Sequence, residues 1–154
     1  MLMLKPRSHT ISQQAGTIRK GGFLMIKGNP CKVIEVATFQ PGKHGKTKCH
    51  FIGTHMFTGR KFEALITTGH NAAVPVVIRT EYVVVNVSAD GFLALMETKV
   101  PYQTRSDLTL PAEKPDVSAR IKALYAEEKE FSVIVLGACN QEMIMDTKVL
   151  SDGS

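Results

Sequence analysis

The sequence contains no tryptophan, few other aromatic residues and three cysteines among its 154 residues. The cysteines are widely spaced, odd in number and form no CxxC pair, which excludes a disulfide framework and a strong thiol redox motif. No apolar run approaches the ~20 residues that a membrane-spanning helix needs. Residues 1–4 are apolar but too short for the core of a signal peptide. We therefore expect a cytoplasmic protein without a membrane partner.

Acidic residues are nearly absent from the first half of the chain. Residues 1–77 hold eleven Lys and Arg but only two carboxylates, Glu35 and Glu63, whereas residues 78–154 hold eight Lys and Arg and twelve carboxylates. Uncompensated charge of one sign repels itself and is typical of a surface that faces a polyanion. The asymmetry predicts two domains, the first of which faces nucleic acid. A solvated basic surface without a partner is the alternative.

The first half predicts a small barrel of the SH3-like kind. Short runs rich in apolar and β-branched residues predict strands, and Gly, Asn and Pro between them predict turns. An extended connector is expected at residues 72–77, because proline disfavours a helix before it. The charge changes sign at this connector, so we place the domain boundary at Val77. The expected strands lie near residues 22–26, 31–36, 48–52 and 61–66.

The second half predicts an OB-fold barrel with one helix, which makes the whole chain mainly β. The helix is expected after Pro115, with Asp116 as its N-cap. Residues 140–148 fit either a strand or a short helix. Apolar residues at helical spacing define the expected buried face of the helix: Val117, Ile121, Leu124 and Tyr125. The predicted division is a tail at residues 1–15, a basic SH3-like domain at 16–77 and an OB-fold domain at 78–154.

A loop rich in glycine and lysine, residues 38–48, separates two predicted strands of the first half. Its Gly45-Lys46-Thr47 is similar to the end of a phosphate-binding loop, but Gln40 occupies the position of the required first glycine. A strand follows, whereas that motif needs a helix to direct N–H groups at phosphate. The GxxG pattern of KH domains joins two helices, and here strands are expected on both sides. The loop therefore fits neither the phosphate-binding motif nor the KH motif. An enzyme that handles phosphate is accordingly disfavoured.

The same loop resembles the modification loop of the initiation factor 5A family. That loop carries Gly-Lys-His-Gly followed closely by a lysine, and Gly42-Lys43-His44-Gly45 and Lys48 occupy these positions. Departures are the Phe39-Gln40-Pro41 stretch, which is usually small and polar, and Lys46 where a second histidine is common. The resemblance covers roughly residues 16–148. Further stretches similar to the family occur in order at residues 19–23, 27–33, 56–63, 70–75, 90–91 and 105–111.

The resemblance implies a non-catalytic translation factor that carries hypusine at Lys43. Deoxyhypusine synthase would transfer an aminobutyl group from spermidine to this lysine, and deoxyhypusine hydroxylase would then hydroxylate it. The factor would bind the ribosome beside the peptidyl-tRNA and promote peptide bond formation at stalled sites and release at termination. No cofactor or metal other than the spermidine-derived group is expected, and the factor would be a monomer or weak dimer.

Further site residues follow from the same resemblance and from the basic charge of the first half. The loop residues expected to face tRNA are Gly42, His44, Gly45, Lys46 and Lys48. The residues expected to contact rRNA are Lys27, Lys32, Arg60 and Lys61.

Other interpretations of the sequence remain open. The chain could be a general RNA-binding module of two small barrels that works unmodified. A zinc site is a weaker possibility, because the spacing of its ligands matches no strong pattern. Cys139 is expected to pack in the core, and the carboxylates of residues 127, 128 and 130 are expected to form an exposed acidic cluster. The candidate zinc ligands are Cys31, Cys49, His50 and His55.

Overall fold

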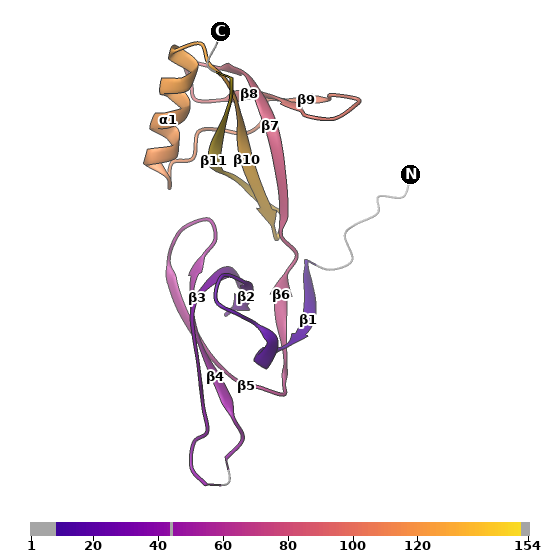
Figure 1. Ribbon diagram of the computed structural model, residues 1–154, viewed down its shortest axis with the longest axis vertical. Coiled ribbons are helices and arrows are strands. Elements are labelled where there is room, and N and C mark those ends of the chain that lie inside the picture. Colours follow the sequence, from indigo (N-terminus) through magenta and orange to yellow (C-terminus); the bar gives the residue numbers. More distant parts are fainter. Residues whose placement is uncertain (1–8, 44, 152–154) are drawn as a thin grey trace. The chain divides into compact units, whose positions relative to one another are not determined.

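A computed structural model describes residues 9–43 and 45–151 of the chain (Figure 1). The described residues form eleven strands, one short 3-10 helix and one α-helix, so the fold is mainly β, as predicted. They divide into two compact units. The first contains the described residues up to Val76 together with residues 138–140, and the second contains the rest.

The first unit is built on a four-stranded antiparallel sheet with the order β2-β3-β4-β5. Two strands of five residues each, β1 and β6, pair with each other in a separate antiparallel sheet. A 3-10 helix, Ala15–Thr17, follows β1. The strand bounds are β1 Thr10–Gln14, β2 Phe23–Ile26, β3 Asn29–Phe39, β4 Lys48–His55, β5 Lys61–Thr67 and β6 Asn71–Pro75.

The core of the first unit lies on one face of this sheet. In β4, Cys49, Phe51 and Gly53 are buried, while the residues between them are partly exposed. A Cβ atom on Gly53 would lie 3.1 Å from Cβ of Cys31 and 3.2 Å from Cδ1 of Ile26. Glycine therefore allows β2, β3 and β4 to pack closely at this position.

The predicted tail is wrong in part, because residues 10–14 belong to the first unit as β1. The predicted connector is extended as expected, and residues 71–75 of it form the strand β6. The register of β1 and β6 pairs Thr10 with Pro75 and Gln14 with Asn71. Sequence periodicity could not reveal this pairing, because it joins segments about sixty residues apart. Residues 1–8 of the predicted tail lie outside the described residues.

The second unit contains a five-stranded antiparallel sheet with the order β11-β10-β7-β8-β9 and the helix α1, which packs against it (Figure 1). Its core consists of residues from the sheet and the helix, including Leu95, Ile121, Phe131 and Val133. The C-terminal segment that fitted either a strand or a helix is the strand β11. The bounds are β7 Ile78–Val87, β8 Leu93–Glu97, β9 Thr104–Arg105, α1 Pro115–Ala126, β10 Glu130–Ala138 and β11 Gln141–Ser151.

The helix and one cysteine differ from their predictions in detail. Lys114 is the N-cap and Pro115 the first helical residue, so Asp116 lies in the first turn instead of capping it. Tyr125 is 40% exposed, and its hydroxyl donates a hydrogen bond to Asn86 Oδ1 at 2.5 Å. Cys139 was expected in the core but is only half-buried. It lies in the tight turn between β10 and β11, where its φ is 51°.

One arginine links β9 and β11, the two edge strands of the five-stranded sheet in the second unit. Arg105 of β9 makes paired hydrogen bonds to Asp107, at 2.6 and 2.7 Å, and to Glu142 of β11, at 2.8 and 3.0 Å. Its guanidinium also lies 5.6 Å from the ring centroid of Tyr82. Two-pronged arginine–carboxylate pairs are strong and directional. Arg105 therefore holds β9 to β11 where no backbone ladder between these strands is observed among the described residues.

Replacing Arg105 with alanine should destabilise the second unit. Two carboxylates lose their partner. Their exposure, 64% for Asp107 and 42% for Glu142, lets solvent screen the interaction, so its net contribution is far below the sum of four charge-assisted hydrogen bonds. We expect the free energy of unfolding in urea to fall by about 2 kcal/mol. Arg79→Ala is the matched control, because Arg79 is exposed and enters no ion pair among the described residues. Equal stability of the two variants would contradict this role.

The same cluster predicts a dependence of stability on pH. The hydrogen bonds from Arg105 lower the pKa of Asp107 below its ordinary value of 3.8. A carboxylate whose pKa is lower in the folded state stabilises the fold above its unfolded pKa and loses this contribution as pH falls through the folded value. The stability gap between the wild type and Asp107→Asn should therefore be present at pH 7 and shrink below about pH 4. A gap independent of pH would exclude the linkage.

Candidate functional site

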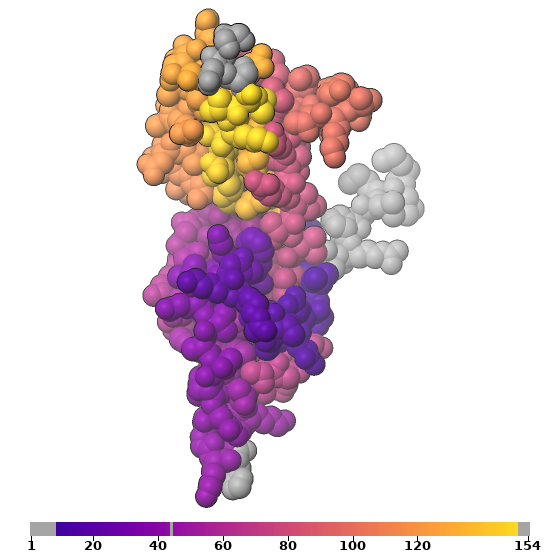
Figure 2. Space-filling view, viewed as in Figure 1, coloured from indigo at the N-terminus to yellow at the C-terminus, as the bar shows by residue number. Residues whose placement is uncertain are grey.

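The candidate site is the loop that joins β3 and β4. The last cross-strand pair of this hairpin is Phe39 with Lys48, which leaves residues 40–47 as the connecting loop. The hairpin is the longest of the first unit, and its end extends beyond the rest of that unit (Figure 2). Lys43 is exposed. His44, a predicted site residue, lies outside the described residues.

Both glycines beside Lys43 are required by the backbone. Gly42 has φ of 75°, a left-handed conformation that glycine adopts without steric cost. A Cβ atom on Gly45 would lie 1.9 Å from the carbonyl oxygen of Pro41, closer than real atoms approach. Nε2 of Gln40 donates a hydrogen bond to the carbonyl oxygen of Gly45 at 2.6 Å and closes the base of the loop. Gln40 and the two glycines therefore frame the segment that presents Lys43.

The C-terminal end of the loop is fixed to the sheet. The carbonyl oxygen of Thr47 accepts hydrogen bonds from the backbone N–H and the hydroxyl of Thr68, at 3.0 and 3.1 Å. Thr68 directly follows β5. These bonds hold the base of the loop on a rigid scaffold, which is how proteins commonly position functional loops.

The loop presents cations that no carboxylate neutralises. Lys43 and Lys46 are exposed and Lys48 is half-buried, and none of them appears in the ion pairs of the described residues. The nearest acidic residue along β5, Glu63, instead lies 3.8 Å from Nε2 of His50. The positive charge at the loop is therefore available to an external anion.

The other predicted basic residues gather at the opposite end of the same sheet. Lys32 and Lys61 both pair with Thr54 of β4, which places them in one row, about 10 Å apart, on the outer face. The guanidinium of Arg60 lies 5.5 Å from the ring centroid of Phe62. Lys27 is exposed in the two-residue turn before β3. The structure therefore separates these residues from the loop lysines by the length of β4, about 20 Å.

The candidate zinc ligands do not converge. Cys31 and Cys49 are buried in the core, and burial raises the pKa of both thiols. His50 lies on the outer face of β4, and Nδ1 of His55 accepts a hydrogen bond from the backbone N–H of Phe57 at 3.1 Å. Among the described residues, no group of three or more His, Cys, Asp or Glu side chains is placed to hold a metal ion.

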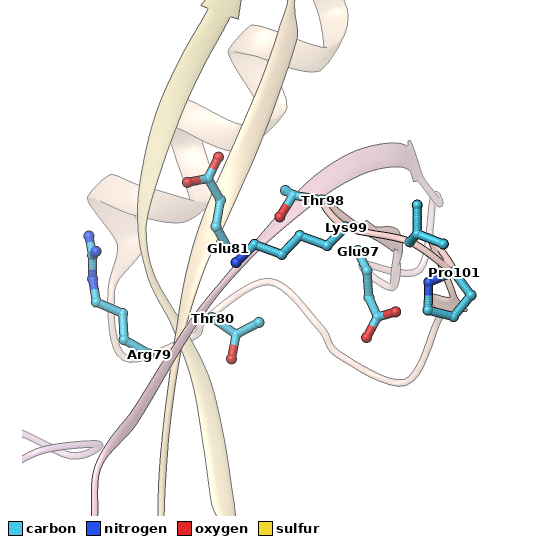
Figure 3. Close-up of a pocket in the computed structure, with 8 residues that line it drawn as sticks. Arg79, Thr80, Glu81, Glu97, Thr98, Lys99 and Pro101 are labelled. Carbon is cyan, nitrogen blue, oxygen red and sulfur yellow. The ribbon is translucent and has the colours of Figure 1, made fainter.

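The second unit contains a groove of about 420 Å³, which is lined by charged and polar residues of both signs (Figure 3). Its two carboxylates already have partners: Glu81 accepts a hydrogen bond from the buried Ser132 at 2.8 Å, and Glu97 accepts one from the backbone N–H of Gln103 at 3.1 Å. They point away from each other in Figure 3. The lining contains no cysteine, serine or histidine, and its hydroxyl and amine groups belong to Thr80, Thr98 and Lys99. The residues are Arg79, Thr80, Glu81, Glu97, Thr98, Lys99, Val100 and Pro101.

Two family models match the chain in succession. The model described as "Translation initiation factor 5A-like, N-terminal" matches residues 8–70, and the model described as "Eukaryotic elongation factor 5A hypusine, DNA-binding OB fold" matches residues 76–148. Initiation factor 5A-4 of Solanum tuberosum is 46% identical over 137 residues, covering 89% of this chain and 84% of the relative. The chain belongs to the eukaryotic translation initiation factor 5A family. It is therefore a translation factor, and the resemblance found in its sequence is confirmed.

Further members of the initiation factor 5A family show the same relationship. Initiation factor 5A of Zea mays is 43% identical over 141 residues, covering 92% of this chain and 86% of the relative. A solved family protein from Naegleria fowleri has a TM-score of 0.81 and 42% identity, covering 92% of this chain and 99% of its own. A solved factor from Methanococcus jannaschii has a TM-score of 0.70 and 25% identity, covering 97% of this chain and all of its own. The predicted SH3-like and OB-fold architecture is confirmed.

The comparisons and the geometry together clarify the competing motifs. A strand, β4, follows Gly45-Lys46-Thr47, so the helix that a phosphate-binding loop requires is absent from this position. Sequence reasoning missed the contribution of Gln40, whose hydrogen bond closes the loop. It treated residues 39–41 only as departures from the family pattern. No local sequence signal identifies such a bond, because it depends on the loop conformation.

No helix of the described residues has the length and apolar character needed to cross a membrane.

Replacing Gly45 with alanine should change the loop without unfolding the first unit. The new methyl group would collide with the carbonyl oxygen of Pro41, so residues 40–47 must adopt another path. We expect backbone amide chemical shifts to change throughout this segment, while those of the buried Phe51 remain as in the wild type. Gly69→Ala is the control, because nothing lies within 4 Å of its added Cβ. Unchanged loop shifts in Gly45→Ala would contradict the close approach.

Proposed function

We propose that this translation factor acts on the ribosome beside the peptidyl-tRNA, through Lys43 in its hypusine form. The exposed position of Lys43 between two structurally required glycines carries the proposal. A side chain at the end of a narrow hairpin reaches into a space that the body of the domain cannot enter. The factor promotes peptide bond formation at stalled sites and release at termination, with no catalytic group of its own.

The surroundings of Lys43 suit a pocket lined by RNA. Lys46 and Lys48 provide two more cations near the loop, and neither is paired with a carboxylate among the described residues. Contacts between lysine and phosphate supply affinity without reading sequence, which is appropriate for a factor that meets many different tRNAs. The row of Lys32 and Lys61 adds phosphate contacts at the other end of the sheet.

The modification extends this arrangement. Deoxyhypusine synthase transfers the aminobutyl group of spermidine to Nζ of Lys43, and deoxyhypusine hydroxylase then adds a hydroxyl group to it. The product is longer than lysine and carries a second cationic nitrogen. The projecting loop supports this step, because the synthase must enclose the lysine in its own cleft. The word hypusine in the description of the second matching family model supports it as well. The factor itself holds no other cofactor, and it works in the cytoplasm as a monomer or weak dimer.

Replacing Lys43 with arginine should abolish the effect on stalled translation. Arginine keeps the charge but is not a substrate for aminobutyl transfer to a lysine nitrogen. We expect factor coexpressed with both modifying enzymes to increase the yield of a reporter that contains a stalling sequence, and Lys43→Arg to leave that yield at the level without factor. A reporter without the stalling sequence should respond to neither protein.

Lys46→Arg is the matched control for this experiment, because Lys46 is also exposed in the same loop. It should keep the activity of the wild type, because arginine preserves the positive charge that Lys46 offers to phosphate. Full activity of Lys43→Arg would contradict the proposal and support the alternative of an unmodified RNA-binding module that uses the Lys32 and Lys61 row.

A further inference from the structure

The outer face of the hairpin carries an exposed aromatic ring next to the loop. Phe39, the last residue of β3, is 44% exposed, although Phe51 and Phe57 of the same unit are almost fully buried. Leu65 of β5 is 53% exposed. The register places Phe39 opposite Lys48, and His50 opposite Leu65 in the neighbouring row of the same face. We call these four residues the stem face.

A β-bulge in β3 gives Phe39 its outward direction. Cys31 and Val33 face the core, and strict alternation would direct residue 39 to the same side. The register shifts between Val33 and Glu35, so that Ile34 is the extra residue. Beyond the bulge, Val36 faces the core and Phe39 the outer side. A bulge commonly redirects side chains near a functional site.

The charges around Phe39 favour a nucleic acid as its partner. Lys48 lies directly opposite the ring across the hairpin, at a Cβ–Cβ distance of about 5 Å. The sequence has no acidic residue between Glu35 and Glu63, and the Glu63 carboxylate lies beside His50. An exposed aromatic ring with a neighbouring lysine provides the two contacts that single-stranded RNA uses: stacking for a base and a cation for its phosphate.

We propose that Phe39 and Lys48 form a stacking subsite for one unpaired RNA base, next to the nucleotide that Lys43 contacts. This proposal rests on the proposed function and extends it. Phe39 and Lys43 are four residues apart, so their Cα atoms lie within about 14 Å of each other and one strand can reach both. The ring binds any base, because every base offers a flat face for stacking.

The test uses the full chain and a short single-stranded RNA that carries a fluorescent base analogue, whose emission falls when the base stacks. Wild-type protein should quench the fluorescence on binding. Phe39→Leu should weaken binding roughly 5- to 150-fold and remove the quenching, because a stacked base contributes on the order of 1–3 kcal/mol. Phe39→Tyr should restore both. Since the ring is exposed, the melting temperature of all variants should match that of the wild type.

A matched control and the salt dependence separate stacking from general effects. Phe92 of the second unit is 43% exposed, so Phe92→Leu removes an equally exposed ring and should bind like the wild type. Phe39→Leu should leave the dependence of affinity on salt unchanged. Lys48→Ala should reduce the slope of log affinity against log salt by about 0.7, the value for one lost phosphate contact in a single strand.

Each outcome distinguishes this subsite from the proposed function. Wild-type affinity and quenching in Phe39→Leu would overturn the subsite and favour a protein partner for the stem face, while leaving the role of Lys43 intact. Absence of quenching by the wild type would overturn it as well. If stacking depends on Phe39 but Lys43→Arg remains fully active in stalled translation, the subsite stands and the proposed function fails.

Discussion

The antiparallel pairing of β3 with β4 is the constraint on which the site depends. This pairing ends at Phe39 and Lys48 and leaves eight residues to reverse the chain. The reversal is possible because Gly42 adopts a positive φ and Gly45 leaves room for the carbonyl oxygen of Pro41. Lys43 stands between these two glycines, so its exposure follows from the geometry of the turn.

The same hairpin combines a base that is fixed to the core with an exposed loop that carries the candidate binding residues. Buried residues of β3 and β4 hold the strands to the core, and Thr68 holds the end of the loop at Thr47. The side chains that could bind RNA lie outside this core, on the loop and on the outer face. Changes at the site can therefore alter binding with little effect on folding, which is typical of functional loops on a rigid scaffold.

Much of the fold was predictable because it follows from local patterns. Alternating and β-branched runs located the main strands, and helical spacing located α1. The pairing of β1 with β6 and the contacts of Arg105 with Glu142 were not predictable, because they join residues that are distant in sequence. Asp116 was the better N-cap by propensity, but Pro115 fixes the first helical position and so makes Lys114 the cap.

The candidate site was partly visible in the sequence. The glycines and lysines of residues 42–48 identified the loop, but the outward direction of Phe39 depends on the bulge at Ile34, which no residue pattern indicates. The central claim is that Lys43 acts as hypusine. Mass mapping of the loop peptide from protein purified from the native organism tests it most directly. The account predicts the hypusine mass on Lys43 and unmodified Lys46 and Lys48, and an unmodified Lys43 in this native protein would contradict it.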